Sequence, residues 1–289
     1  MSDDAPQFET VRYRVDGAVA TITLARPDKA NAMSMQLIDE VDAAFSLAGT
    51  DPAVRVVVLD AEGRNFCSGH DLAELVGPDA DPAIVAERAT AEGKFAQEKR
   101  MYVDRCVRIY EFPKPTIAAV QGWCIAGGTD MVLNVDLIVA AESARFGYPP
   151  ARVWGVPEAP WVWVARLGLE RAKRYLFTGD ELTAREAADA GMILECVPDD
   201  ALDARAVALA DRMALLPLNQ LQMMKWMLND VARHQYQPDT SRLLGFIFDG
   251  VARHTQEGLD FVERAQEVGW REVIRERDRP FGDYGERDR

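Results

Sequence analysis

The chain has 289 residues, 48% of them hydrophobic, which is enough for one large globular domain or two small ones. Its formal net charge of −14 argues against nucleic acid as a partner, because such binding depends largely on Lys and Arg side chains that neutralise phosphates. An anionic small molecule is not excluded, since local cations and peptide dipoles act at short range.

The sequence also limits location and chemistry. No apolar run reaches the roughly 18 to 20 residues that a membrane helix needs, and the acidic amino terminus lacks the features of a secretory signal. We therefore expect a cytoplasmic protein with no membrane partner. Four scattered cysteines and three distant histidines form no ligand cluster, which predicts reduced thiols and no metal site.

Short apolar runs in the first half of the chain predict strands, at residues 17–24, 54–59, 115–120 and 136–141. Between the first two, apolar side chains recur at helical spacing over residues 34–48, behind a serine that is able to cap a helix. Strands that alternate with helices indicate an α/β domain with a largely parallel sheet.

The remainder is mostly helical in composition. Residues 75–103 lose strand character and predict a mobile loop followed by a helix. From Thr183 onward, a possible capping box (Thr183 and Glu186), one short strand at residues 193–197 and several amphipathic segments predict a helical subdomain or an oligomerisation layer. We expect the charged tail after Phe281 to be frayed.

Two glycine-containing turns follow predicted strands, at residues 65–71 and 122–130, and the second ends in Asp130. Glycine permits backbone conformations that are closed to other residues, so peptide N–H groups can converge on one oxygen. Two such turns side by side would form an oxyanion hole. The alternative is that each is an ordinary connection between a strand and a helix.

Five segments together resemble the crotonase (enoyl-CoA hydratase/isomerase) superfamily, and the likeness covers roughly residues 8 to 283. These segments are residues 26–32, 66–72, 114–130, 136–147 and 178–191. The resemblance implies a repeated ββα spiral core over residues 8–198 and a helical carboxyl region over residues 199–283 that builds trimers or paired trimers. It also implies flexible ends (1–7 and 284–289), a coenzyme A thioester as substrate, and no permanently bound cofactor.

By position, the resemblance makes the peptide N–H groups of His70 and Gly127 the two donors to the thioester oxygen, where they would stabilise an enolate. Hydratases of the family carry two glutamates, but the first position is Asp130 here and the second is Pro150, which cannot take a proton. Glu158 matches the position of a working acid in some other members. Asp130 could instead be a helix-start acid, and Glu158 a helix-start or surface acid.

The resemblance also places the substrate. It implies that coenzyme A lies near the turn of Arg26, Lys29 and Ala30 and along Ser68, Asp71 and Leu72, with Gly128 and Trp154 also in contact with the substrate. A lysine that some relatives carry is Ala73 here. Arg26 and Lys29 could instead be solvated turn charges, His70 could present its ring to the pocket mouth, and Asp71 is expected to brace the following turn. The aromatic group of Tyr148, Trp154, Trp161 and Trp163 could line the acyl pocket or belong to the core.

The expected function is that of an acyl-CoA enzyme that adds water to, or moves, a C=C bond of an enoyl-CoA. Asp130 and Glu158 would transfer the protons. Two alternatives remain open: a non-catalytic acyl-CoA binder of the same fold, and a specialised lyase or dehalogenase.

Overall fold

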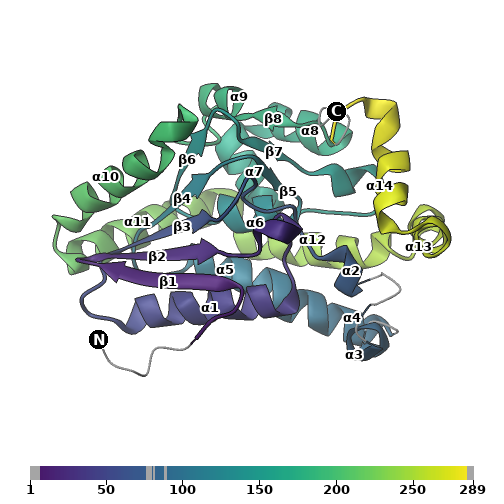
Figure 1. The fold of residues 1–289 in the computed structure, drawn as a ribbon, viewed down its shortest axis with the longest axis horizontal. Coiled ribbons are helices and arrows are strands. Elements are labelled where there is room, and N and C mark those ends of the chain that lie inside the picture. The colour runs from purple at the N-terminus through teal and green to yellow at the C-terminus, as the bar shows by residue number, and fades with distance from the viewer. Residues whose placement is uncertain (1–6, 76–79, 81, 88–89, 285–289) are drawn as a thin grey trace.

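A mostly parallel sheet lies at the centre of the computed structural model, which describes residues 7–75, 80, 82–87 and 90–284 (Figure 1). Within these residues the sheet has six strands in the order β1-β2-β3-β4-β6-β9. They are β1 Val11–Asp16, β2 Val19–Leu24, β3 Val56–Ala61, β4 Thr116–Val120, β6 Leu137–Ala141 and β9 Glu195–Val197. β1 pairs with β2 in antiparallel register, and the other neighbours are parallel. The predicted parallel α/β sheet is confirmed.

Side chains alternate between the two faces of this sheet, and each face is covered by a helix. Ile22 and Leu59 enter the main core together with α1 (Met35–Thr50). Val58 and Ile117 point to the opposite face and pack with α10 (Leu202–Ala214). The predicted serine cap is confirmed as well, because the Ser34 hydroxyl accepts the N–H of Leu37 at 3.1 Å.

A second, three-stranded sheet within the described residues was not predicted. It consists of β5 (Trp123–Ile125), β7 (Arg145–Gly147) and β8 (Leu182–Thr183), with β5 parallel to β7 and β8 antiparallel. Strands of two or three residues are too short to show a periodic pattern. The glycine turn that follows β4 therefore contains a short strand, β5, before α6 begins.

The region between β3 and β4 is more helical than predicted. Its elements are α2 (Leu72–Leu75), α3 (Pro82–Glu87), α4 (Ala91–Glu98), a π-helical turn (Lys99–Val103) and α5 (Asp104–Tyr110). The predicted loop is wrong for α3, while the predicted helix that follows is confirmed. Residues 76–79, 81 and 88–89 lie outside the described residues, so the predicted mobility stays a prediction.

Helices dominate the rest of the chain. They are α6 Gly127–Leu133, α7 Pro160–Leu167, α8 Leu169–Thr178, α9 Ala184–Asp189, α11 Leu218–Tyr236, α12 Pro238–Ala252, α13 Gln256–Val268 and α14 Trp270–Asp278. The capping box of Thr183 and Glu186 is confirmed. Among the described helices, none is both long and apolar enough to cross a membrane. The cytoplasmic location and the division into a core and a helical region stay predictions.

The chain remains anchored beyond Phe281, contrary to the expected fraying. Asp283 pairs with the buried Arg152 guanidinium at 2.6 Å, and the Tyr284 ring lies 5.3 Å from that of Trp123. These contacts hold residues 283 and 284 against the body of the protein. Residues 1–6 and 285–289 lie outside the described part of the chain, so the flexibility expected there is untested.

Candidate active site

The two glycine-containing turns lie side by side and are joined by backbone hydrogen bonds. Cys67 donates its N–H to the Trp123 carbonyl at 2.9 Å, and the Cys67 carbonyl accepts the N–H of Ile125 at 3.0 Å. Gly69 has a φ of +91°, and a Cβ at that position would lie 3.3 Å from the Gly127 nitrogen. Only glycine allows the two backbones to approach this closely.

Gly127 is the first residue of α6, so its N–H has no acceptor within the helix. The preceding residue, Ala126, has a φ of +53°, a left-handed conformation that is strained for alanine and marks a sharp turn into the helix. The His70 ring lies directly over Gly127, because a Cβ there would be 2.7 Å from both Cδ2 and Nε2 of the imidazole. The structure thus brings His70 and Gly127, the two residues predicted to carry the oxyanion donors, into contact through the His70 ring.

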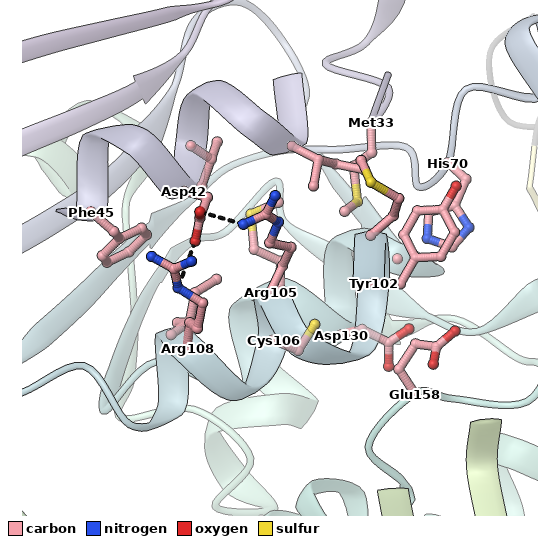
Figure 2. Close-up of a pocket in the computed structure, with 16 residues that line it drawn as sticks. Met33, Asp42, Phe45, His70, Tyr102, Arg105, Cys106, Arg108, Asp130 and Glu158 are labelled. Carbon is pink, nitrogen blue, oxygen red and sulfur yellow. Dashed lines mark hydrogen bonds and ion pairs between the residues drawn. The ribbon is translucent and has the colours of Figure 1, made fainter. Parts of the chain in front are cut away.

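The His70 side chain is stacked on Tyr102, with the ring centroids 3.8 Å apart and the ring planes 23° apart. Tyr102 belongs to the π-helical turn, an irregularity that is often found at functional sites. Both residues line the same cavity (Figure 2). No pattern in the sequence indicates Tyr102, since its contact with His70 depends on the path of a helix 32 positions further along the chain.

Asp130 lies one turn into α6 and is 1% exposed. Neither of its carboxylate oxygens has a hydrogen-bond partner among the described residues. The backbone N–H of Glu158 lies outside ordinary hydrogen-bond geometry but still favours the ionised form of Asp130. Burial raises the pKa of Asp130 well above its usual range, and the charge of Asp249 raises it further. The alternative of a simple helix-start acid does not explain a carboxyl that is fully desolvated and faces a cavity.

Glu158 precedes α7, in which Pro160 is the first residue, and is 3% exposed. Its Oε2 atom has no hydrogen-bond partner within the described part of the chain. Burial raises its pKa well above the usual range, and the charges of Asp249, Glu98 and Asp130 raise it further. Figure 2 shows the carboxyl groups of Asp130 and Glu158 close to each other on one wall of the cavity. The surface-acid alternative for Glu158 is wrong.

The cavity is lined mostly by apolar side chains, and the empty space in it, part of which is open to solvent, is about 490 Å³. His70, Gly127, Asp130 and Glu158 lie at one end. Hydrophobic side chains from α1, the π-helical turn, α5 and α6 also line the cavity, namely Ile38, Val41, Met101, Ile109 and Met131. At the far end Asp42 forms ion pairs with Arg105 and Arg108 (Figure 2). An extended apolar group with a polar head at the acids would fit this shape.

Only some of the residues predicted to bind coenzyme A lie near the glycine turns. Arg26 pairs with Asp71 at 3.0 Å, so Arg26 is not a freely solvated charge. Asp71 also accepts the N–H of Ala73 at 3.2 Å, which confirms its bracing role. The N–H of Ser68 donates to the carbonyl of Ala30 at 3.1 Å, which holds the two segments together.

The other residues predicted to contact the substrate have different surroundings. Leu72 begins α2 directly after Asp71, and Lys29 is an exposed turn residue. Gly128 packs against Cys67, where a Cβ would lie 2.7 Å from the Cys67 carbonyl oxygen, so its role is close packing of the turns. Trp154 does not line the cavity formed by the described residues and packs on Phe261, 4.9 Å away between ring centroids.

Three of the four aromatic residues belong to the main core. Tyr148, Trp161 and Trp163 are buried in the main hydrophobic cluster, and none of them lines the cavity as described. Tyr148 donates its hydroxyl to the carbonyl of Val156 at 2.9 Å, which braces the segment that carries Glu158. The pocket-lining alternative for these residues is wrong, and the core alternative is confirmed.

A family model for enoyl-CoA hydratase/isomerase matches residues 14–271. The chain belongs to the enoyl-CoA hydratase/isomerase family. A crystal structure of an enoyl-CoA hydratase from Mycobacterium smegmatis is 39% identical, covers 96% of each chain and superposes with a TM-score of 0.88. The expected crotonase fold and the enzyme class are thereby confirmed.

Family relatives differ in the reaction that they are named for. A hydroxycinnamoyl-CoA hydratase-lyase of Pseudomonas fluorescens is 33% identical over 68% of this chain and 70% of its own length. A 1,2-epoxyphenylacetyl-CoA isomerase of Escherichia coli is 28% identical over 77% of this chain and 82% of its own. Family membership therefore determines the class of enzyme. Which reaction this chain catalyses has to be inferred from the residues of its site.

Pro150 occupies the position where the resemblance leads us to expect the second acid. It lies in a short 3₁₀ turn (Pro149–Arg152), and its carbonyl accepts the N–H groups of Val153, Trp154 and Gly155. No carboxyl can act from that residue. Within the part of the chain that the structure describes, the acids on the cavity wall beside the glycine turns are Asp130 and Glu158.

Proposed function

We propose that this chain moves the C=C bond of an enoyl-CoA, with the N–H groups of His70 and Gly127 stabilising the thioester enolate and Asp130 and Glu158 transferring the protons. The observation that supports the proposal is the position of two buried carboxyl groups, both facing one apolar cavity, beside two adjoining glycine turns. Backbone donors that are fixed before the reaction act on charge that develops during it, and each typically contributes about 3 to 4 kcal/mol.

The proton steps balance within the pair. With a 3-enoyl-CoA, the ionised carboxyl removes a proton from C2, and the electrons move onto the thioester oxygen as a dienolate. The protonated carboxyl then donates its proton to C4, which leaves the double bond between C2 and C3. This sequence needs one ionised and one protonated acid at neutral pH. Burial that raises the pKa of both Asp130 and Glu158 favours a pair that retains one proton.

Two substrates distinguish migration from hydration. We expect a 3-enoyl-CoA to be converted into the 2-enoyl isomer, and Asp130→Asn or Glu158→Gln to reduce the rate at least about 100-fold, the usual scale for general acid–base catalysis. Asp211→Asn is the matched control, since Asp211 is an exposed acid on α10, away from the cavity lining. If both acid variants retain the wild-type rate on every thioester tested, the assignment of the acids is wrong.

Hydration is a second candidate, because the structurally similar protein from Mycobacterium smegmatis is titled an enoyl-CoA hydratase. Two facing carboxyls could also hold and polarise a water. Loss of absorbance at the enoyl thioester band with crotonyl-CoA measures this reaction directly. The missing acid at Pro150 speaks against the two-glutamate form of hydration. Neither the non-catalytic binder nor the dehalogenase is favoured by the relatives' names.

For the coenzyme A portion, we infer that it lies along the turn of Arg26 and the segment of Ser68 and Asp71, with Lys29 as an exposed cation for a phosphate. The Arg26–Asp71 pair supports this placement, because it fixes the guanidinium beside the glycine turn. Lys29→Ala should raise the KM for an acyl-CoA and leave kcat unchanged. An unchanged KM would place the phosphates elsewhere.

We also infer a homotrimer or a dimer of trimers, in which α11 and α12 supply contact surface. Large apolar side chains on these helices are strongly exposed: Trp226 is 70% exposed, Met227 61% and Val231 63% on α11, and Phe248 53% and Val251 55% on α12. Exposed apolar surface on this scale is typical of interfaces. Sedimentation should give the mass of three or six chains, and Trp226→Glu should lower it; a monomeric wild type would contradict the inference.

A further inference from the structure

A cluster of buried charge lies behind Glu158, on the side of the carboxyl away from the sequence motifs. Glu98 at the end of α4 is fully buried, and Asp249 on α12 is 3% exposed. One carboxylate oxygen from each of Glu98, Glu158 and Asp249 lies within 4.8 Å of the others. Three acids from distant parts of the chain therefore share one desolvated space.

Arg253, which follows α12, supplies positive charge to this cluster. Its Nη2 atom lies 2.9 Å from Asp249 Oδ2 and its Nη1 atom 3.2 Å from Glu98 Oε1, and its side chain is only 12% exposed. The guanidinium also lies over the Trp154 ring, 5.3 Å from its centroid. The arginine thus joins α4 to α12 immediately behind the active site.

Asp249 is connected to the Glu158 segment through the backbone as well. Its Oδ1 atom accepts the N–H of Val156 at 3.4 Å, two residues before Glu158. The neighbouring Gly250 lets α12 approach α4, since a Cβ there would lie 2.1 Å from Phe95. The position of α12 and the position of Glu158 are therefore set together.

The charges around Glu158 act on it in opposite directions. Asp249, Glu98 and Asp130 favour its protonated form, whereas Arg253 favours the ionised form. The other ionisable groups packed around this space come from α4, the π-helical turn, α5, the connection between β7 and the 3₁₀ turn, and α12. They are Lys94, Tyr102, Cys106, Tyr148 and Arg242. Groups this close titrate as a set, so changing one charge alters the proton held by another.

We propose that Asp249 and Arg253 are positioning residues that set the orientation and the protonation state of Glu158 from behind, so that α12 supplies part of the active site. The proposal rests on the proposed role of Glu158 in proton transfer. It extends the site beyond the glycine turns to a helix that the sequence predicts only as part of a subdomain or an oligomerisation layer. Neither residue touches the cavity in the described structure, so both act through Glu158.

Two substitutions should shift the titration midpoint of Glu158 in opposite directions. Asp249→Asn removes a like charge and should shift the Glu158 titration to lower pH by about one unit or more, the usual effect of a charge at this distance. Arg253→Met removes the opposing charge and should shift it to higher pH, while Arg253→Lys should restore most of the wild-type value. Asp211→Asn, an exposed acid on α10, should shift nothing.

The titration is measured without turnover, by infrared difference spectroscopy of the protonated carboxyl band over a pH series. The Glu158 band is the one that Glu158→Gln removes. The pH dependence of kcat should then shift in the same direction in each variant. If Arg253→Met does not fold, Asp249→Asn and Arg253→Lys still decide the matter.

An unchanged Glu158 midpoint in a folded Asp249→Asn variant would overturn the proposal. Lowered thermal stability without a shifted midpoint would show that the network is only structural, and would overturn it too. Because the infrared measurement does not depend on catalysis, the proposal can fail or succeed independently of the enoyl-CoA activity.

Discussion

Replacing Gly127 by alanine should impair catalysis more than folding. The added Cβ would lie 2.7 Å from Cδ2 and Nε2 of His70 and 3.0 Å from the Met33 sulfur. Ordinary van der Waals contact begins near 3.4 Å, so the ring must move by about 0.7 Å. Tyr102 stacks on the ring at 3.8 Å, so the imidazole cannot retreat without moving the π-helical turn.

The displaced ring is carried by the same residue whose N–H is one of the two proposed oxyanion donors. Misplacing one donor should lower kcat/KM by about 100- to 1,000-fold, which corresponds to about 3 to 4 kcal/mol. Overpacking typically destabilises a fold by about 1 to 3 kcal/mol, so the protein should still fold. Both effects are measured on one preparation, as kcat/KM for an enoyl-CoA and as the free energy of unfolding in urea.

The cause can be separated by a double-mutant cycle. His70→Ala keeps the backbone N–H and removes the ring, so adding it to Gly127→Ala should restore much of the lost kcat/KM. If Gly127→Ala retains full activity, or if the second substitution restores none of it, then the ring does not couple the two residues and the reasoning about this contact is wrong.

Three further changes have distinct outcomes. Asp130→Asn should raise the free energy of unfolding more at pH 8 than at pH 4. The folded state raises the pKa of this buried acid above its usual 3.8, so the wild-type acid destabilises the fold increasingly as the pH rises above 3.8. An equal gain in stability at both pH values would contradict this. Val41→Trp should fill part of the cavity and lower kcat/KM for long acyl chains far more than for short ones, whereas an equal loss would show that the acyl chain does not pass Val41. Gly128→Ala should lower stability, since its Cβ would meet the Cys67 carbonyl oxygen at 2.7 Å, and normal urea unfolding would refute that packing role.

Local signals in the sequence predicted the parts of the structure that depend on neighbouring residues. The Ser34 cap, the capping box at Thr183 and the strand runs of the main sheet follow from side chains a few positions apart, and all are found. The two glycine turns were recognisable for the same reason, because their conformation depends on positions that only glycine can occupy.

The remainder of the site depends on packing between distant segments. Tyr102 meets His70 only because the helix bulges at that point. Asp249, paired with Arg253, lies beside Glu158 although it comes from a much later part of the chain. No periodic pattern encodes such contacts. The pocket role considered for Trp154 was wrong because its partner, Phe261, lies more than 100 positions away and draws the ring into a separate cluster.

The most direct test of the account is deuterium uptake from D₂O into the acyl group of a 3-enoyl-CoA, followed by mass spectrometry or NMR. It reports formation and protonation of the enolate whatever the final product. We predict rapid uptake with the wild type and none above the uncatalysed rate with the Asp130→Asn, Glu158→Gln double variant. Wild-type uptake by a folded double variant would contradict the central claim that these two buried acids move the protons.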